Sequence, residues 1–119
     1  MFVLKGILRA ESQEQILLYL LTRGKGYGKA IAEFYGVPLN PIQKQLARLE
    51  SDGVVVSRAI GKLREYEFNP RYPFLKPLRD LLKVGLSAYP KTVQAQLVLT
   101  RKRPRKAEKI LRPVEGKNS

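Results

Sequence analysis

The stretch from Gly36 to Val55 constrains the fold of this chain more than any other part of the sequence. Asn40 is a residue type that caps helix N-termini, and Pro41 follows where a missing N–H costs nothing, so a helix is predicted to begin here. Gly53 is predicted to end it in the left-handed conformation, before a β-branched strand that starts at Val54. The apolar residues of the helix recur at spacings of four and three, which places them on one face: Ile42, Leu46 and Leu49.

The opposite face of this helix, over residues 41–52, is small, polar and basic. A face of this kind fits the major groove of DNA, where amide and guanidinium groups can read base edges. The same pattern is also typical of any solvated helix surface, so the interpretation depends on the surrounding elements. The residues expected to face the groove are Asn40, Gln43, Lys44 and Arg48.

The charge balance narrows the choice of partner. The 119 residues include 23 Lys and Arg against 10 Asp and Glu, a net charge of +13, and this length suits one compact domain with a tail. A field this positive favours polyanions, with nucleic acid first and an anionic membrane surface second. The longest strictly apolar run, Ile16 to Leu21, is far below the roughly 20 residues that span a bilayer, and no signal peptide is recognisable, so a cytoplasmic protein is expected.

The residue inventory argues against an enzyme. The chain has no cysteine and no histidine, which excludes disulfides, Cys/His metal sites and catalysis by thiolate or imidazole. The carboxylates form no convincing catalytic pair, since Glu65 and Glu67 share one exposed strand face and Glu50 and Asp52 lack a base partner. The run GKGYG at residues 24–28 lacks the spacing of a phosphate-binding loop and is predicted to be a flexible turn. No cofactor and no metal are therefore expected.

The segments before residue 36 supply two further helices. Apolar residues between Ile16 and Leu21 predict a largely buried helix that Gly24 ends, and a short helix is predicted from about Gly28 to Tyr35. Residues 1–9 suit either a short helix or an extended arm packed on the domain.

Gly28 to Val55 resembles the helix-turn-helix of winged-helix transcriptional regulators of the ArsR and MarR type. The similarity covers about residues 12–86, and the runs YGKAIAEFYGVPLNPIQKQLARLE and FNPRYPFLKPLRDLL look like a variant found alone or joined to a small nucleotidyltransferase domain. The resemblance implies a winged helix-turn-helix (α+β), mainly α with a small β-hairpin, with N- and C-terminal flanking helices. The positions that carry it are Ala32, Gly36, Leu49, Glu50, Gly53 and Val54.

A β-hairpin is predicted downstream, from strands over residues 54–60 and 64–69 that Gly61 and Lys62 connect. In the family that the chain resembles, this hairpin (54–69) is the wing. Its basic residues Arg58, Lys62 and Arg64 are expected to contact phosphates beside the groove, which positions a protein without specifying a sequence.

The last helix, predicted to begin between Tyr72 and Pro77, has more apolar surface than a small domain needs, and Gly85 and Tyr89-Pro90 are expected to end it. The terminal helices of the resembled regulators pair two protomers, so we expect a homodimer, although the helix could also simply close the monomer core. Residues 92–100 fit either an extended arm or a short helix. The expected organisation is therefore a DNA-binding domain over 1–90 and a flexible basic arm over 91–119 that follows DNA or remains a solvated tail.

The sequence thus predicts a transcriptional regulator that binds double-stranded DNA sequence-specifically, with helix 41–52 in the major groove and wing 54–69 on the backbone. The alternative is a winged-helix interaction or architectural module that binds a protein partner, RNA, or DNA without sequence specificity. Nothing in the sequence identifies a small-molecule effector.

Overall fold

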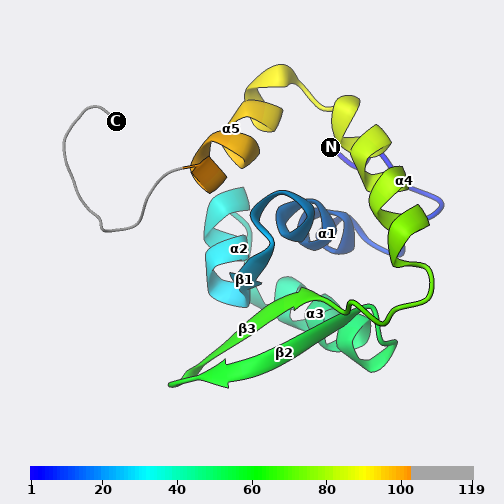
Figure 1. Ribbon diagram of the computed structural model, residues 1–119. Coiled ribbons are helices and arrows are strands. Elements are labelled where there is room, and N and C mark those ends of the chain that lie inside the picture. Colours follow the sequence, from blue (N-terminus) through cyan, green and yellow to red (C-terminus); the bar gives the residue numbers. More distant parts are fainter. Residues whose placement is uncertain (103–119) are drawn as a thin grey trace.

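The computed structural model describes residues 1–102 as an α+β fold of five helices and a three-stranded antiparallel sheet (Figure 1). This arrangement is compatible with a winged helix. The elements are, in chain order, α1 (Glu11–Arg23), β1 (Lys25–Tyr27), α2 (Gly28–Tyr35), α3 (Leu39–Ser51), β2 (Val55–Ile60), β3 (Leu63–Phe68), α4 (Leu75–Ser87) and α5 (Lys91–Lys102).

Helix α1 forms the centre of the core. Seven consecutive residues from Ile16 to Thr22 are buried, because α2, α3, α4 and α5 all pack against this helix. Figure 1 shows α1 in the middle of the molecule, with α4 on one side of it and α3 on the other. Gly24 ends the helix with a φ of 86°, as its position in the sequence predicted. No helix within residues 1–102 has the length and apolar character needed to cross a membrane.

The two helices α2 and α3 are joined by a three-residue turn. Helix α2 has the predicted bounds, and Gly36 follows it in the left-handed conformation, with a φ of 66°. The prediction that Asn40 caps α3 is wrong, because the helix begins two residues earlier than predicted, at Leu39, with Pro38 at the cap position and no side-chain cap bond. Leu39 lies beside Gly28 at the start of α2, and this tertiary contact accompanies the earlier start.

The sheet has the order β1-β3-β2, so the last strand of the hairpin lies in the middle. The hairpin was predicted, but β1 was not. Residues 24–28 were expected to form a flexible turn, whereas Lys25–Tyr27 instead pair with β3, with Gly26 opposite Tyr66. Val55 lies opposite Phe68 and both are buried, which makes theirs the inner face of the sheet. The register places Ser57, Ala59, Arg64 and Tyr66 on that same face.

The C-terminal helices differ in part from expectation. Gly85 does not end α4 but lies inside it, buried where an added Cβ would come within 3.3 Å of Leu4. Residues 91–102 form helix α5 rather than a flexible arm, and Leu97 of that helix is fully buried. Because α5 packs against α1, the folded part continues past the expected boundary at residue 90. The remainder of the expected arm lies outside the described residues.

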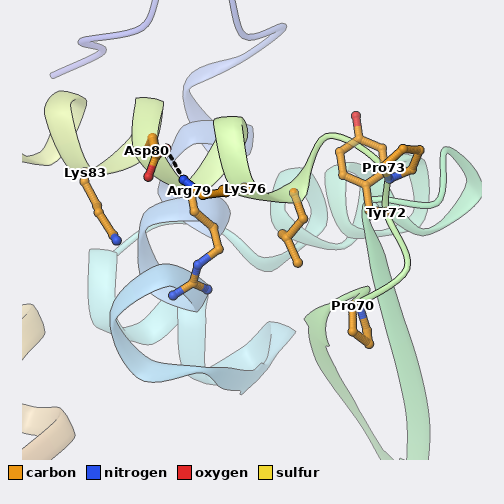
Figure 2. A pocket seen from close by; sticks show the side chains of 8 residues that line it. Pro70, Tyr72, Pro73, Lys76, Arg79, Asp80 and Lys83 are labelled. Carbon is orange, nitrogen blue, oxygen red and sulfur yellow. Dashed lines mark hydrogen bonds and ion pairs between the residues drawn. The ribbon is translucent and has the colours of Figure 1, made fainter.

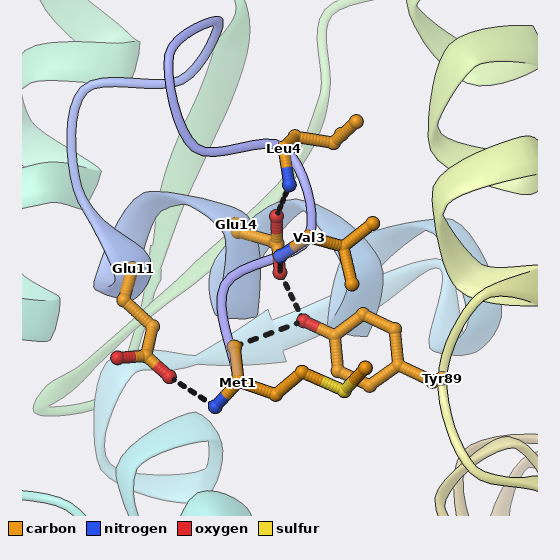
Figure 3. A network of polar contacts seen from close by, with 6 residues as sticks. All are labelled: Met1, Val3, Leu4, Glu11, Glu14 and Tyr89. Atoms are coloured by element: carbon orange, nitrogen blue, oxygen red, sulfur yellow. Dashed lines mark hydrogen bonds and ion pairs between the residues drawn. The ribbon is translucent and has the colours of Figure 1, made fainter.

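The N-terminal segment is attached to the domain by a buried carboxylate (Figure 3). Glu14 of α1 is completely buried and accepts hydrogen bonds from the backbone N–H groups of Val3, at 2.9 Å, and Leu4, at 2.6 Å. The hydroxyl of Tyr89, which follows α4, donates to the same carboxylate. The terminal ammonium of Met1 pairs with Glu11 at 2.9 Å. Residues 1–8 therefore form a strap between α1 and the end of α4.

Candidate nucleic-acid interface

Helix α3 presents the polar face that the sequence predicted. Its inner side packs in the core through Ile42, Leu46 and Leu49, and the amide of Gln45 is buried beside them. On the outer side, Asn40, Gln43 and Lys44 are exposed and Arg48 is half-buried. The buried side fixes the axis of the helix, so these four polar side chains are directed away from the core.

The three basic residues of the hairpin do not share one surface. Lys62 lies in the exposed turn, next to Gly61 with its φ of 61°. Arg64 belongs to the inner face of the sheet, whereas Arg58 lies opposite Glu65 on the outer face and pairs with that carboxylate at 3.3 Å. The charge of Arg58 is therefore partly neutralised by Glu65, and this residue is the weakest member of the predicted phosphate-binding set.

A chain of hydrogen bonds connects the hairpin to α3. A guanidinium nitrogen of Arg64 donates to the Ser57 hydroxyl at 3.0 Å, and that hydroxyl donates to the carboxylate of Glu50 at 2.6 Å. Glu50 is in the last turn of α3, so these hydrogen bonds link β2 and β3 to the helix. The Glu50 carboxylate also places one negative charge near the predicted DNA-binding face.

The structure brings three of the predicted residues together in one hollow of about 290 Å³ between α3 and the hairpin. Gln43, Lys62 and Arg64 line it, and we call it the α3-wing hollow. A third cation, Lys29 in the first turn of α2, also lines it and was missed by the sequence analysis. The only available signal was that Lys29 follows a glycine at a helix start, which does not indicate its distant neighbours.

Two further residues shape the α3-wing hollow, Gly28 at its edge and Tyr66 on its inner wall. Gly28 lies at its edge, where a Cβ would come within 3.3 Å of a Leu46 methyl group. Tyr66 lines the inner wall, and burial together with the negative charge of Glu50 raises the pKa of its hydroxyl, although Arg64 opposes the shift. Tyr66 therefore remains a neutral donor beside the cations. The arrangement suits an anionic ligand whose oxygen atoms accept hydrogen bonds.

Within residues 1–102, no group of three or more His, Cys, Asp or Glu side chains is placed to hold a metal ion. A scan of the sequence against protein-family models finds no match, and searches of curated proteins and of solved structures find no similar protein.

Proposed function

We propose that this protein is a winged helix-turn-helix transcriptional regulator that binds double-stranded DNA sequence-specifically. The observation that carries the proposal is the α3-wing hollow, where an amide from α3 lies beside three cations from α2 and the hairpin. Helix α3 enters the major groove in this proposal, and its amino-terminal half, with Gln43 and Lys44, contacts base edges. The hairpin follows the sugar-phosphate backbone, where Lys62 and Arg64 bind phosphate oxygen atoms.

Several features of the fold support this function. The helix-turn-helix unit contains a short turn with a left-handed glycine, and a β-hairpin follows it directly. The net charge of +13 supplies the attraction to a polyanion that all DNA binding requires. Gln43 is suited to adenine, and Arg48 or Lys44 to guanine, because these side chains match the hydrogen-bonding pattern of the base edges.

A homodimer is part of the proposal. Pro77 and Val84 of helix α4 and Ala88 just after it are exposed, and the half-buried Leu81 continues this apolar stripe at spacings of three and four; the exposed fraction of Val84 is 69%. Dimerisation through this stripe would bury surface that the monomer leaves in water. Analytical ultracentrifugation should show a dimer for the full chain and a monomer for Val84→Asp, while Ile60→Asp on the hairpin should stay dimeric.

The experiment that tests the proposed function is selection of bound sequences from a randomised DNA duplex library, with affinities repeated at several salt concentrations. A defined motif, palindromic with half-sites near one helical turn apart, is the expected result for a dimeric regulator. Affinity that falls steeply with salt but selects no motif would contradict sequence-specific binding.

A second candidate, a winged-helix module that binds a protein partner, RNA, or DNA without sequence specificity, is favoured by one observation. The outer face of the sheet exposes three large apolar side chains, those of Val56, Ile60 and Leu63, with exposed fractions between 37% and 48%. Exposed apolar surface of this kind is a feature of protein contacts. If complexes of the chain persist after Lys44→Ala and Arg48→Ala, this second function gains support over the first.

A further inference from the structure

A second hollow lies away from α3, between helix α4 and the loop that follows β3 (Figure 2). Its volume is about 440 Å³, which is within the range of pockets that hold small ligands or a few side chains. We call it the α4 groove. It is lined by Pro70, Tyr72, Pro73, Leu75, Lys76, Arg79, Asp80 and Lys83.

One wall of the α4 groove is basic. Lys76, Arg79 and Lys83 follow one another at spacings of three and four, so they share one flank of α4. The guanidinium of Arg79 lies 5.9 Å from the centre of the Phe68 ring, so the Arg79 side chain is in contact with the sheet. Lys76 pairs with Asp80 at 3.3 Å, but the Lys76 side chain is 88% exposed, and three cations face a single carboxylate. An anionic ligand is therefore favoured here.

The other wall is apolar and shaped by the loop. Tyr72 is half-buried and its ring packs edge-on against Phe74, with the ring centres 5.7 Å apart. Pro70 and Pro73 restrict the backbone of the loop on either side of Tyr72, and Leu75 forms the floor at the start of α4. This wall offers apolar contact to a ligand that is held by the cations opposite.

The α4 groove is separate from the surfaces used by the proposed function. None of the residues that line the α4 groove lines the α3-wing hollow, so a protein bound to DNA through that hollow keeps the groove free. The basic flank of the groove lies next to the apolar stripe that includes Val84 but is distinct from it, because Lys83 and Val84 are about 100° apart around the helix. A ligand in the α4 groove would therefore bind independently of the proposed DNA binding and dimerisation.

We propose that the α4 groove binds an acidic, amphipathic peptide segment of another protein. Its Asp and Glu side chains pair with Lys76, Arg79 and Lys83, and its apolar side chains pack against Tyr72 and Leu75. Charge complementarity selects this occupant over others. The tail of this same chain, residues 103–119, is basic, so the cations of the groove repel it. Duplex nucleic acid presents sugars and phosphates at its surface and no apolar side chains that could pack against Tyr72 and Leu75.

The test uses the full chain and a short fluorescein-labelled peptide in which Asp and Glu alternate with Leu and Phe. Fluorescence anisotropy measures its dissociation constant, and a second peptide with Ser in place of Leu and Phe has the same charge. Lys83→Glu reverses an exposed charge in the groove, and Lys91→Glu is the matched control on α5, outside the groove. Thermal unfolding of both variants, followed by circular dichroism, verifies that they are folded.

We expect saturable binding of the apolar peptide, weaker binding of its Ser counterpart, and about tenfold weaker binding to Lys83→Glu, since reversal replaces an attraction with a repulsion. Lys91→Glu should change the affinity by less than about twofold. Amide resonances of residues 70–83 should shift on binding in a ¹⁵N correlation spectrum, while those of α3 stay in place.

Four results would overturn the proposal. Equal losses for Lys83→Glu and Lys91→Glu, or no saturable binding at all, would mean that only diffuse charge attracts the peptide. Peptide-induced shifts in α3 and not in 70–83 would assign the peptide to the α3-wing hollow. A single-stranded oligonucleotide that binds more tightly than the peptide, and loses affinity through Lys83→Glu, would make the groove a nucleic-acid contact. None of these results depends on whether the DNA selection succeeds.

Discussion

The hydroxyl of Tyr89 donates a hydrogen bond to the carboxylate of Glu14, two residues that are 75 positions apart in the sequence (Figure 3). The bond closes a network in which the same buried carboxylate also holds the backbone of Val3 and Leu4. One acidic side chain thereby joins α1, the N-terminal strap and the end of α4.

Removing the Tyr89 hydroxyl should cost measurable stability. Tyr89→Phe leaves the buried Glu14 carboxylate with one donor fewer, and we expect the free energy of unfolding to fall by about 1.5–3 kcal/mol. Urea denaturation measures the change. Tyr72→Phe, which removes a hydroxyl outside this network, is the matched control. Equal and small effects of the two variants would show that Glu14 does not depend on the Tyr89 donor.

Stability should decrease in alkaline solution. Burial raises the pKa of Tyr89 above its usual range, and the hydrogen bond to Glu14 adds to the shift; burial and the Glu14 charge raise the pKa of Tyr35 in the same direction. Above pH about 10 the unfolded chain loses these protons while the folded protein keeps them, so the free energy of unfolding falls as pH rises. Denaturation midpoints between pH about 9 and 11 should therefore fall, and fall less for Tyr89→Phe. A pH-independent midpoint over that range would contradict the prediction.

Two glycines near the α2 start should respond differently to alanine. A Cβ at Gly26 would lie 2.6 Å from Cε1 of Tyr19, whose ring is confined by Phe34 and by the guanidinium of Arg23, 4.7 Å from its centre. Gly26→Ala should lower the free energy of unfolding by about 1–3 kcal/mol. At Gly28 the nearest atom is 3.3 Å away and is the end of a leucine side chain, so Gly28→Ala should change stability by less than about 1 kcal/mol. Thermal denaturation distinguishes the two, and the reverse order would show that Tyr19 moves freely.

Arg48 and Lys62 should affect DNA binding in different ways. Arg48→Ala removes a base contact in the proposed function, so discrimination between the selected site and random DNA should decrease by about 1–3 kcal/mol. Lys62→Ala removes a phosphate contact, so all duplexes should bind more weakly, and the slope of log affinity against log salt should decrease by about one. Salt-dependent anisotropy titrations measure both. Uniform losses from both variants would mean that the two roles are assigned incorrectly.

Neutralising Glu50 should strengthen DNA binding. Its carboxylate acts on Tyr66, which lines the α3-wing hollow, and Glu50→Gln keeps an oxygen that can accept the Ser57 hydrogen bond. We expect affinity for all duplexes to increase about twofold to fivefold, the size of one exposed charge interaction. Glu33→Gln, at an exposed carboxylate of α2, is the control with the same charge change. A loss of affinity in Glu50→Gln would show that the link between Arg64, Ser57 and Glu50 matters more than the charge.

Much of the fold could be predicted from local patterns. Helix α2 was predicted with its observed bounds, Gly24 was predicted to end α1, and the left-handed conformation of Gly53 was predicted because glycine adopts such angles without strain. The start of α3 was not predicted correctly. Asn40 has a side chain typical of a helix cap, and the contact of Leu39 with the start of α2 cannot be read from the sequence. Pairing of β1 with β3 was missed for the same reason, because Gly26 and Tyr66 meet only after folding.

Some features of the candidate site could be predicted from the sequence and others could not. The periodicity of α3 predicted that Gln43 and Lys44 are exposed, because helix geometry alone relates them to the buried leucines. The pairing of Arg58 with Glu65 and the presence of Lys29 in the α3-wing hollow required knowledge of strand register and of helix packing.

The sequence by itself determined where most helices lie, where glycine turns separate them and how basic the protein is, because these properties depend on residues a few positions apart or on composition. Tertiary structure alone decided that Glu14 holds residues 3 and 89, that α5 packs on α1 and that three cations share one hollow. These contacts join residues distant in the chain, and no local pattern encodes which distant groups become neighbours when the core forms.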